Sequence, residues 1–289
     1  MSGLTHIAVL PKEVLENLIS TECRVFVDAT VGGAGHALGV LDRNRKLHFI
    51  GIDRDQEALD RAGKTLERYS DRVTLLKGNF RDLKEMLHGI GVSSMDGILF
   101  DLGISSYQLA GSRGFSFKDD EELDMRMDTR DVLTAYEIVN SYRQDEIARI
   151  LYEYGEEWQS RKIAKAIFDR RKKDRIRTAR ELADVILAVK KKTGKIHPAT
   201  KTFQALRIAV NDELASLAGG MDAAVDLLSP GGRIGVITFH SLEDRMVKQR
   251  FRSDEALTVL TRKAIKPGIE EIRSNPRSRS AKLRVAEKI

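Results

Sequence analysis

Apolar and polar residues alternate in blocks along the first hundred residues of the chain. The blocks between the apolar runs have apolar residues at helical spacing, most clearly at 56–69 and 83–88. Strands that alternate with helices form parallel sheets with right-handed crossovers and helices on both faces. The chain therefore predicts a Rossmann-like α/β fold with a mostly parallel sheet. Its first four strands are expected at residues 25–29, 47–52, 73–76 and 97–102.

This alternation stops between about residues 105 and 200. An acidic segment at 118–131 is followed by helical patterns at 134–140, 145–154, 161–171 and 179–192. We interpret residues 107–200 as an all-helical domain inserted into a sheet domain made of residues 1–106 and 201–289, with Gly194 and Pro198 marking the return linker. The sheet domain is then expected to resume with helices at 202–217 and 221–228 and strands at 233–239, 257–261 and 282–286.

Charge is unevenly distributed over the 289 residues, whose formal net charge is +6. Residues 161–195 hold 14 Lys/Arg against 4 Asp/Glu, and residues 262–289 hold 9 against 3. Two basic blocks on an otherwise acidic chain favour a polyanionic partner such as RNA. Either block could instead be a solvated helix face.

The single cysteine, Cys23, excludes an internal disulfide framework and a multi-cysteine zinc site, which suits a reducing cytoplasm. Residues 1–9 do not read as a signal peptide, and no run approaches the ~20 apolar residues of a membrane span. A cytoplasmic protein with no membrane partner is expected.

A glycine-rich turn follows the first predicted strand and precedes a helix, in the segment Asp28-Ala29-Thr30-Val31-Gly32-Gly33-Ala34-Gly35-His36. Open α/β sheets bind ligands at the carboxyl ends of their strands, where this turn lies. Asp53 ends the second strand, where a carboxylate can accept hydrogen bonds from both ribose hydroxyls. Together they indicate a nucleoside-containing cofactor, either NAD or S-adenosylmethionine.

Three features favour S-adenosylmethionine. The loop lacks the third glycine of the dinucleotide pattern. Asp28 would repel a pyrophosphate but suits a sulfonium or amino group, although it could simply cap the turn. The segment Ser229-Pro230-Gly231-Gly232 before the fifth strand resembles the turn at that position in class I methyltransferases.

Asp101 ends the fourth strand beside the expected cofactor cleft. Exocyclic amines of cytosine and adenine are poor nucleophiles because their lone pairs are delocalised into the ring. A carboxylate that accepts an amine hydrogen can align the lone pair for attack on a methyl carbon. Asp101 is therefore the candidate catalytic residue, although capping of the strand or contact with the cofactor alone would equally explain it.

With these motifs, the chain resembles the bacterial 16S rRNA (cytosine-N4)-methyltransferase family. The resemblance implies a class I methyltransferase domain split by a helical domain. It also implies methyl transfer to N4 of a cytidine in the decoding centre of 16S rRNA, in the small ribosomal subunit or a late precursor. A homodimer is one option for its oligomeric state. The matching segments are 28–36, 51–55, 78–80, 96–106, 113–117, 123–128, 154–157, 197–200, 203–213, 239–245 and 275–280.

Carried over position by position, the resemblance implies a set of cofactor-binding residues. The family usually has proline where Ala8 and Tyr107 stand, and a longer segment after Phe251, so the loop into the inserted domain and one RNA contact are in doubt. The implied cofactor contacts are Gly33, Ala34, Gly35 and His36 in the turn, Asp53 on the ribose, Phe80 near the adenine, and Asp101 and Gln108 lining the cleft.

Other residues leave alternatives open. Phe115 and Phe117 could stack on a base or anchor a core, Asn211 and Glu213 could face the cleft or cap a helix, and Trp158 is expected to pack. His36 and His240 have no second ligand at metal spacing, so no metal is expected; His240 could contact substrate or be structural. An NAD-dependent oxidoreductase and a non-catalytic RNA-binding assembly factor are the alternative functions.

Overall fold

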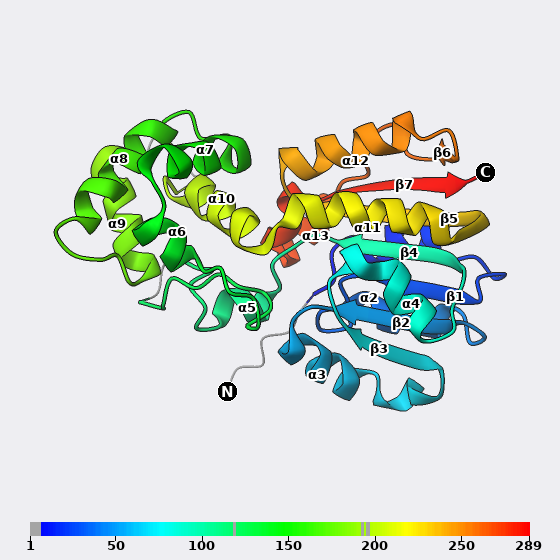
Figure 1. Cartoon of the computed structure of the whole chain (residues 1–289). Helices are drawn as coiled ribbons and strands as arrows, with labels where there is room; N and C mark the ends of the chain where they lie inside the picture. The colour runs from blue at the N-terminus through cyan, green and yellow to red at the C-terminus, as the bar shows by residue number, and fades with distance from the viewer. Residues whose placement is uncertain (1–6, 118–119, 192–193, 195–196) are drawn as a thin grey trace. The chain divides into compact units, whose positions relative to one another are not determined.

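A seven-stranded sheet is built from residues before 106 and after 213 in the computed structural model, which describes residues 7–117, 120–191, 194 and 197–289 (Figure 1). The strand order is β3-β2-β1-β4-β5-β7-β6; neighbours among the first five pair in parallel, and β7 is antiparallel to both β5 and β6. The predicted α/β class is confirmed. The strands are β1 (Val25–Asp28), β2 (His48–Asp53), β3 (Val73–Lys77), β4 (Met95–Asp101), β5 (Leu228–Thr238), β6 (Leu257–Val259) and β7 (Lys282–Lys288).

Both faces of the sheet are covered by helices, which explains why the central strands consist mostly of apolar residues. Successive residues of a strand point to opposite faces, so Phe26 joins the core under α1 and α2 whereas Val27 joins the core under α4 and α11. The helices of this unit are α1 (Pro11–Leu18), α2 (Gly35–Arg43), α3 (Gln56–Thr65), α4 (Leu83–Gly89), α11 (Glu213–Leu227), α12 (Ser241–Ser253) and α13 (Ile269–Ser274), with 3-10 turns η1 (Glu67–Arg72), η2 (Phe80–Asp82) and η3 (Pro276–Ser280).

Residues 106–213 form a second, helical unit, in which the helices at Ala135–Ser141 and Ala179–Val189 begin at polar caps. The Thr134 hydroxyl accepts a hydrogen bond from Glu137 N, and Thr178 and Glu181 form a capping box. The side chain of Asn140 bonds both backbone groups of Ile176 and so ties α6 to the entry of α9. Its helices are α5 (Ser106–Ala110), α6 (Ala135–Ser141), α7 (Gln144–Gly155), α8 (Ser160–Arg171), α9 (Ala179–Val189) and α10 (Thr200–Asn211).

The helical unit is larger than the predicted 107–200, because it spans Ser106–Glu213 and includes α10. The prediction assigned α10 to the sheet domain because its helical pattern leads toward the fifth strand. In the structure α10 packs on α7, and the Gln204 side chain donates to Tyr154 O at 3.1 Å. A Cβ on Gly155 would lie 2.6 Å from Lys201 O, so this glycine permits the close approach of the two helices.

The break between the two long helices before β5 also differs from its predicted position. The sequence predicted separate helices at 202–217 and 221–228, but α11 runs without a break from Glu213 to Leu227. The chain instead breaks at Asp212, whose φ of 47° ends α10. The predicted turn before the fifth strand is a bulge within β5, since Leu228 pairs with Met95 and Arg233 with Gly97.

Gly220 is required by packing. A Cβ there would lie 2.7 Å from the Phe80 ring and 3.2 Å from Phe100, whereas the nearest atom to a Cβ on Gly219 is 3.8 Å away. Alanine normally stabilises a helix interior relative to glycine. Substitution by alanine should therefore change the free energy of unfolding in opposite directions at the two adjacent positions.

We expect Gly220→Ala to lower the free energy of unfolding by about 1–3 kcal/mol through overpacking. Gly219→Ala, the matched control, should raise it by about 0.5–1 kcal/mol. Urea denaturation of both variants measures the difference. If both substitutions stabilise the protein, Phe80 does not pack on α11 as described.

Candidate cofactor and substrate site

The glycine turn between β1 and α2 takes a backbone path that crosses into the left-handed region twice. Gly32 has φ +50° and Ala34, the N-cap of α2, has φ +67°. The amide of Ala34 donates to Val31 O at 2.7 Å and closes the turn. Gly35 and His36 begin α2, so the amide N–H groups of its first turn have no partner within the helix. All four turn residues predicted to contact the cofactor therefore lie in one tight segment.

Asp53, at the end of β2, fastens this turn. Its Oδ2 accepts from Gly32 N at 2.9 Å and its Oδ1 accepts from Asp55 N at 2.9 Å. Burial raises the pKa of Asp53 to about 6, against the opposing effect of these backbone hydrogen bonds. Each carboxylate oxygen can accept a further hydrogen bond. The two backbone hydrogen bonds of Asp53 are therefore compatible with the predicted contact to a ribose.

Asp28 is buried at the end of β1, with only 2% of its surface exposed. Its Oδ1 accepts from Thr30 N at 3.0 Å, which is the turn-capping arrangement that the sequence left open. Burial raises the pKa of Asp28 to about 7; nearby Asp101 and Asp53 act in the same direction, and His36 opposes them. The turn thus buries a carboxyl group whose ionised form a cationic ligand would stabilise.

Asp101 and His36 meet at the same edge of the sheet. His36 Nε2 lies 3.5 Å from Asp101 Oδ2. Among the described residues, neither His36 Nε2 nor Asp101 Oδ1 has a hydrogen-bond partner, although both atoms are buried. Burial lowers the pKa of His36, but Asp101, with smaller contributions from Asp28 and Glu271, reverses this and raises it overall. Unsatisfied buried polar atoms of this kind are typical of sites that bind a ligand.

Thr30 is a site residue that the sequence interpretation missed. Its Oγ1 accepts a hydrogen bond from Asp101 N at 2.7 Å and donates one to Asp28 Oδ1 at 3.4 Å. One hydroxyl therefore joins the ends of β1 and β4 and sets the spacing of the two carboxylates. The only local signal was a hydroxyl residue two positions after Asp28.

Phe80 follows β3 and is half-buried in η2. Its ring packs edge-on against Phe100, with ring centroids 5.4 Å apart. Asn79 Nδ2 and Arg81 Nη2 both donate to Ser216 Oγ, which holds η2 against α11. Gly78 N donates to Asp53 O, so the segment leading to Phe80 starts beside the ribose-binding candidate. Gln108 is buried on α5 of the helical unit, and its contact with the cofactor stays a prediction.

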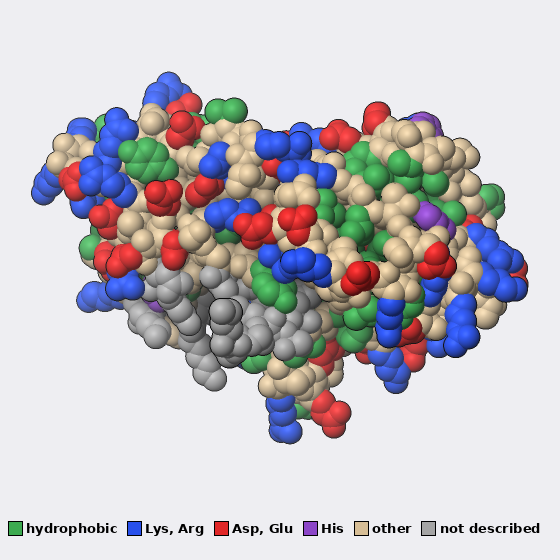
Figure 2. All heavy atoms as spheres, turned by 90° about the horizontal axis from the view of Figure 1, so that it is seen from below, with side chains coloured by type: hydrophobic (Ala, Val, Ile, Leu, Met, Phe, Trp, Pro, Cys, Tyr) green, Lys and Arg blue, Asp and Glu red, His purple; other side chains and the backbone are tan. Residues whose placement is uncertain are grey.

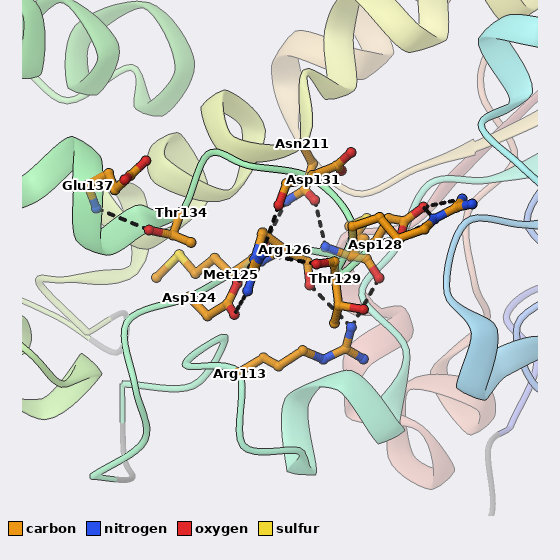
Figure 3. A network of polar contacts seen from close by, with 12 residues as sticks. Arg113, Asp124, Met125, Arg126, Asp128, Thr129, Asp131, Thr134, Glu137 and Asn211 are labelled. Atoms are coloured by element: carbon orange, nitrogen blue, oxygen red, sulfur yellow. Dashed lines mark hydrogen bonds and ion pairs between the residues drawn. The ribbon is translucent and has the colours of Figure 1, made fainter.

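The segment around residues 123–128, which had no predicted chemistry, forms a polar network within the helical unit (Figure 3). Arg113 Nη1 donates to the carbonyl oxygens of Arg126 and Met127. The Asn211 amide bonds Met127 N and Met125 O, so it holds this loop. Met125 has φ +62°, a backbone conformation that such fixed contacts sustain.

Among the remaining candidate side chains, some pack within the protein and one is exposed to solvent. Phe115 is buried, and Phe117 stacks on His197, so both pack within the helical unit. His240 caps α12, with its Nδ1 accepting from Glu243 N at 3.4 Å, which favours the structural interpretation. Trp158 contradicts the expectation that it packs, because 83% of its surface is exposed.

Comparison with known proteins finds one matching family. Residues 3–289 match the MraW methylase family. A ribosomal RNA small subunit methyltransferase H from Sulfurihydrogenibium sp. (strain YO3AOP1) is 50% identical, with 98% of this chain and 99% of the relative covered. The protein of the same name from Brevibacillus brevis is 45% identical, with 98% of each covered.

A more distant match is the solved structure of an rRNA methylase from Streptococcus thermophilus, with a TM-score of 0.45, 11% identity, and 96% of this chain and 93% of that chain covered. Separately, the described helices include none with the length and apolar character that spanning a membrane requires.

The raised pKa of Asp28 predicts a pH-dependent stability difference. Its folded pKa of about 7 lies above the unfolded value near 3.9, so the folded state binds more protons between these values and the wild type loses stability as pH rises. Asn cannot ionise. We expect Asp28→Asn to gain about 2 kcal/mol relative to wild type between pH 5 and pH 8 in urea denaturation.

The exposed Asp60 on α3 provides a control for the loss of one carboxylate. Asp60→Asn should show no comparable gain between the two pH values. A stability difference between Asp28→Asn and wild type that is the same at pH 5 and pH 8 would mean that Asp28 does not titrate in this range.

Proposed function

The chain belongs to the MraW methylase family, and on this premise we propose that it transfers the methyl group of S-adenosylmethionine to N4 of a cytidine in the decoding centre of small-subunit rRNA. The observation that carries the proposal is the buried Asp101 Oδ1 next to the glycine turn, which has no hydrogen-bond partner in the part of the chain that the structure describes. Nothing in the family match favours an NAD-dependent oxidoreductase.

The buried charges at the strand ends suit S-adenosylmethionine. Asp28 is buried and Asp53 is partly buried, and His36 beside Asp101 only partly offsets the charge of their ionised forms. A ligand with a sulfonium and an ammonium group compensates buried negative charge, whereas a pyrophosphate would add to it. We assign the turn Gly33-Ala34-Gly35 and His36 to the methionine side of the ligand, Asp53 to its ribose and Phe80 to its adenine.

When bound, S-adenosylmethionine supplies a methyl group that is already activated for transfer. The contribution of the chain is therefore to prepare the nucleophile. Asp101 Oδ1 accepts one hydrogen of the cytidine amine and turns the nitrogen lone pair toward the methyl carbon. As the N–C bond forms, the S–C bond of the methyl donor breaks and S-adenosylhomocysteine leaves. The methylated nitrogen then carries a positive charge and gives up one proton, for which Asp101 Oδ1 is the proposed acceptor.

Methylation at cytosine C5 is disfavoured by the state of the cysteine. That chemistry needs a thiolate nucleophile. Cys23 is the only cysteine in the chain, is buried before β1, and donates to Val25 O. Burial, with a smaller contribution from Asp96, raises the pKa of Cys23 to about 12, so its thiol stays protonated.

We propose that the helical unit recognises the RNA. Lys and Arg side chains gather over the end formed by α8 and α9, with acidic side chains interspersed (Figure 2). Lys172 and Lys173 are exposed there, whereas Arg171 donates to Val139 O and Tyr142 O and is structural. Lys192 and Lys195 of the same basic block lie outside the described residues. The second block includes the exposed Arg279 in η3 of the sheet unit.

The proposed reaction can be tested with small ribosomal subunits that lack the modification. The protein is incubated with labelled S-adenosylmethionine, and the labelled nucleoside is identified after digestion of the rRNA. We expect N4-methylcytidine at one position of the decoding centre. Label on cytosine C5, on another nucleoside, or on no nucleoside would refute the proposal.

Substitution of Asp101 should affect the rate more than binding. Asp101→Ala should lower single-turnover methylation by about 10²–10³-fold, the scale for removing one hydrogen-bond partner of the transition state. Asp101→Asn should lose less, since its amide oxygen still accepts. If cofactor affinity falls in proportion to the rate, Asp101 is a cofactor ligand and does not orient the amine.

RNA binding should weaken steeply with salt, because binding releases counterions from the phosphates. Reversing Lys172 and Lys173, or Arg279, should flatten the slope of log affinity against log salt by about 0.7 per lost phosphate contact. Lys64→Glu, an exposed lysine of α3 outside both blocks, is the control. An unchanged slope in both charge-reversed variants would exclude the basic blocks from the RNA-binding surface.

A further inference from the structure

Two aromatic side chains lie exposed at the junction of α7 and α8. Trp158 is 83% exposed and Tyr152 is 54% exposed, although large aromatic side chains are usually well buried. Their rings contact each other edge to face, with centroids 6.1 Å apart. Folding alone does not explain this pair, because most of the Trp158 surface stays in water and contributes little burial.

The backbone that carries Trp158 is held firmly on both sides. Glu157 is buried, forms an ion pair with Lys190, and accepts a hydrogen bond from Gln159 N at 3.0 Å. Ser160 is also buried, and its amide donates to Glu157 O. The exposed indole therefore projects from a fixed segment, which lowers the entropy cost of using it as a binding surface.

Cations are available beside the aromatic pair. Arg161 and Lys162, which follow Trp158 on the first turn of α8, are exposed, and no acidic side chain within the described ranges pairs with either. The next lysine of α8, Lys165, is by contrast paired with Asp169. Glu153 lies next to Tyr152 and reduces the net charge, so the aromatic rings are the distinctive feature of this surface.

We propose that Tyr152 and Trp158 form a stacking platform for an unpaired base of the RNA, which rests on the proposed function in that the substrate is RNA. Bases of single-stranded RNA stack on aromatic side chains, and cations beside the rings contact the phosphates. A protein partner or a second copy is less suited, because a specific protein interface buries about 1,200–2,000 Å² and not one ring pair.

Trp158 is the only tryptophan of the chain, so its fluorescence reports on this surface alone. The full-length protein is titrated with a single-stranded RNA covering the decoding-centre sequence, and with a fully paired duplex of the same strand. We expect the single strand to quench Trp158 fluorescence and to protect it from acrylamide, and the duplex to do so much less.

Variants of Trp158 distinguish the contribution of ring stacking to RNA affinity from the contribution of charge. Trp158→Ala should weaken binding of the labelled single strand by about 5- to 50-fold, and Trp158→Phe should retain most of the affinity. The slope of log affinity against log salt should not change, because no charge is removed. Val132→Ala, which truncates an apolar side chain that is 86% exposed in the same unit, is the control and should bind as wild type does.

The outcomes distinguish this proposal from the proposed function. If the RNA binds and is methylated while Trp158 fluorescence and Trp158→Ala affinity stay unchanged, the platform is refuted and the methyltransferase stands. If neither RNA nor ribosomal subunits bind or become methylated, the proposed function itself fails. Quenching that appears with rising protein concentration in the absence of RNA would assign the surface to self-association and overturn the platform.

Discussion

The withdrawal of three carboxylates from water at the ends of neighbouring strands, one of them buried and two partly buried, is the constraint on which the site depends. Asp28, Asp53 and Asp101 end β1, β2 and β4 at one edge of a parallel sheet. Taking carboxylates out of water costs free energy unless they are protonated, hydrogen-bonded or paired with a cation. The protein uses backbone amides and His36 for part of this compensation. A cationic ligand can supply the remaining compensation.

The surrounding backbone is shaped by the same constraint. Asp53 uses one oxygen on Gly32 and the other on Asp55, so the ribose-binding candidate also fixes the turn that receives the rest of the cofactor. Thr30 serves Asp28 and Asp101 together. Positioning and binding are therefore not separable residue by residue, and substitutions at these positions are expected to have coupled effects.

Sequence patterns predicted those features that depend on local order. The central strands were recognisable because burial on both faces makes them mostly apolar, and Asp53 and Asp101 were recognisable because they end such runs. The role of Thr30 and the internal hydrogen bonds of Arg171 were not predictable, because each depends on residues distant in sequence. The exposure of Trp158 was missed for the same reason, since its neighbours Glu157 and Ser160 are buried by other helices.

The insertion of the helical unit between β4 and β5 has a consequence for how the chain folds. Until β5 arrives, β4 presents an open edge of the growing sheet, which can pair with the wrong strand or with another chain. A helical insert rich in local contacts folds faster than a parallel sheet. If the segment from Ser106 to Glu213 folds first, the connection between β4 and β5 that must close becomes effectively shorter. The edge of β4 is then exposed to aggregation for less time.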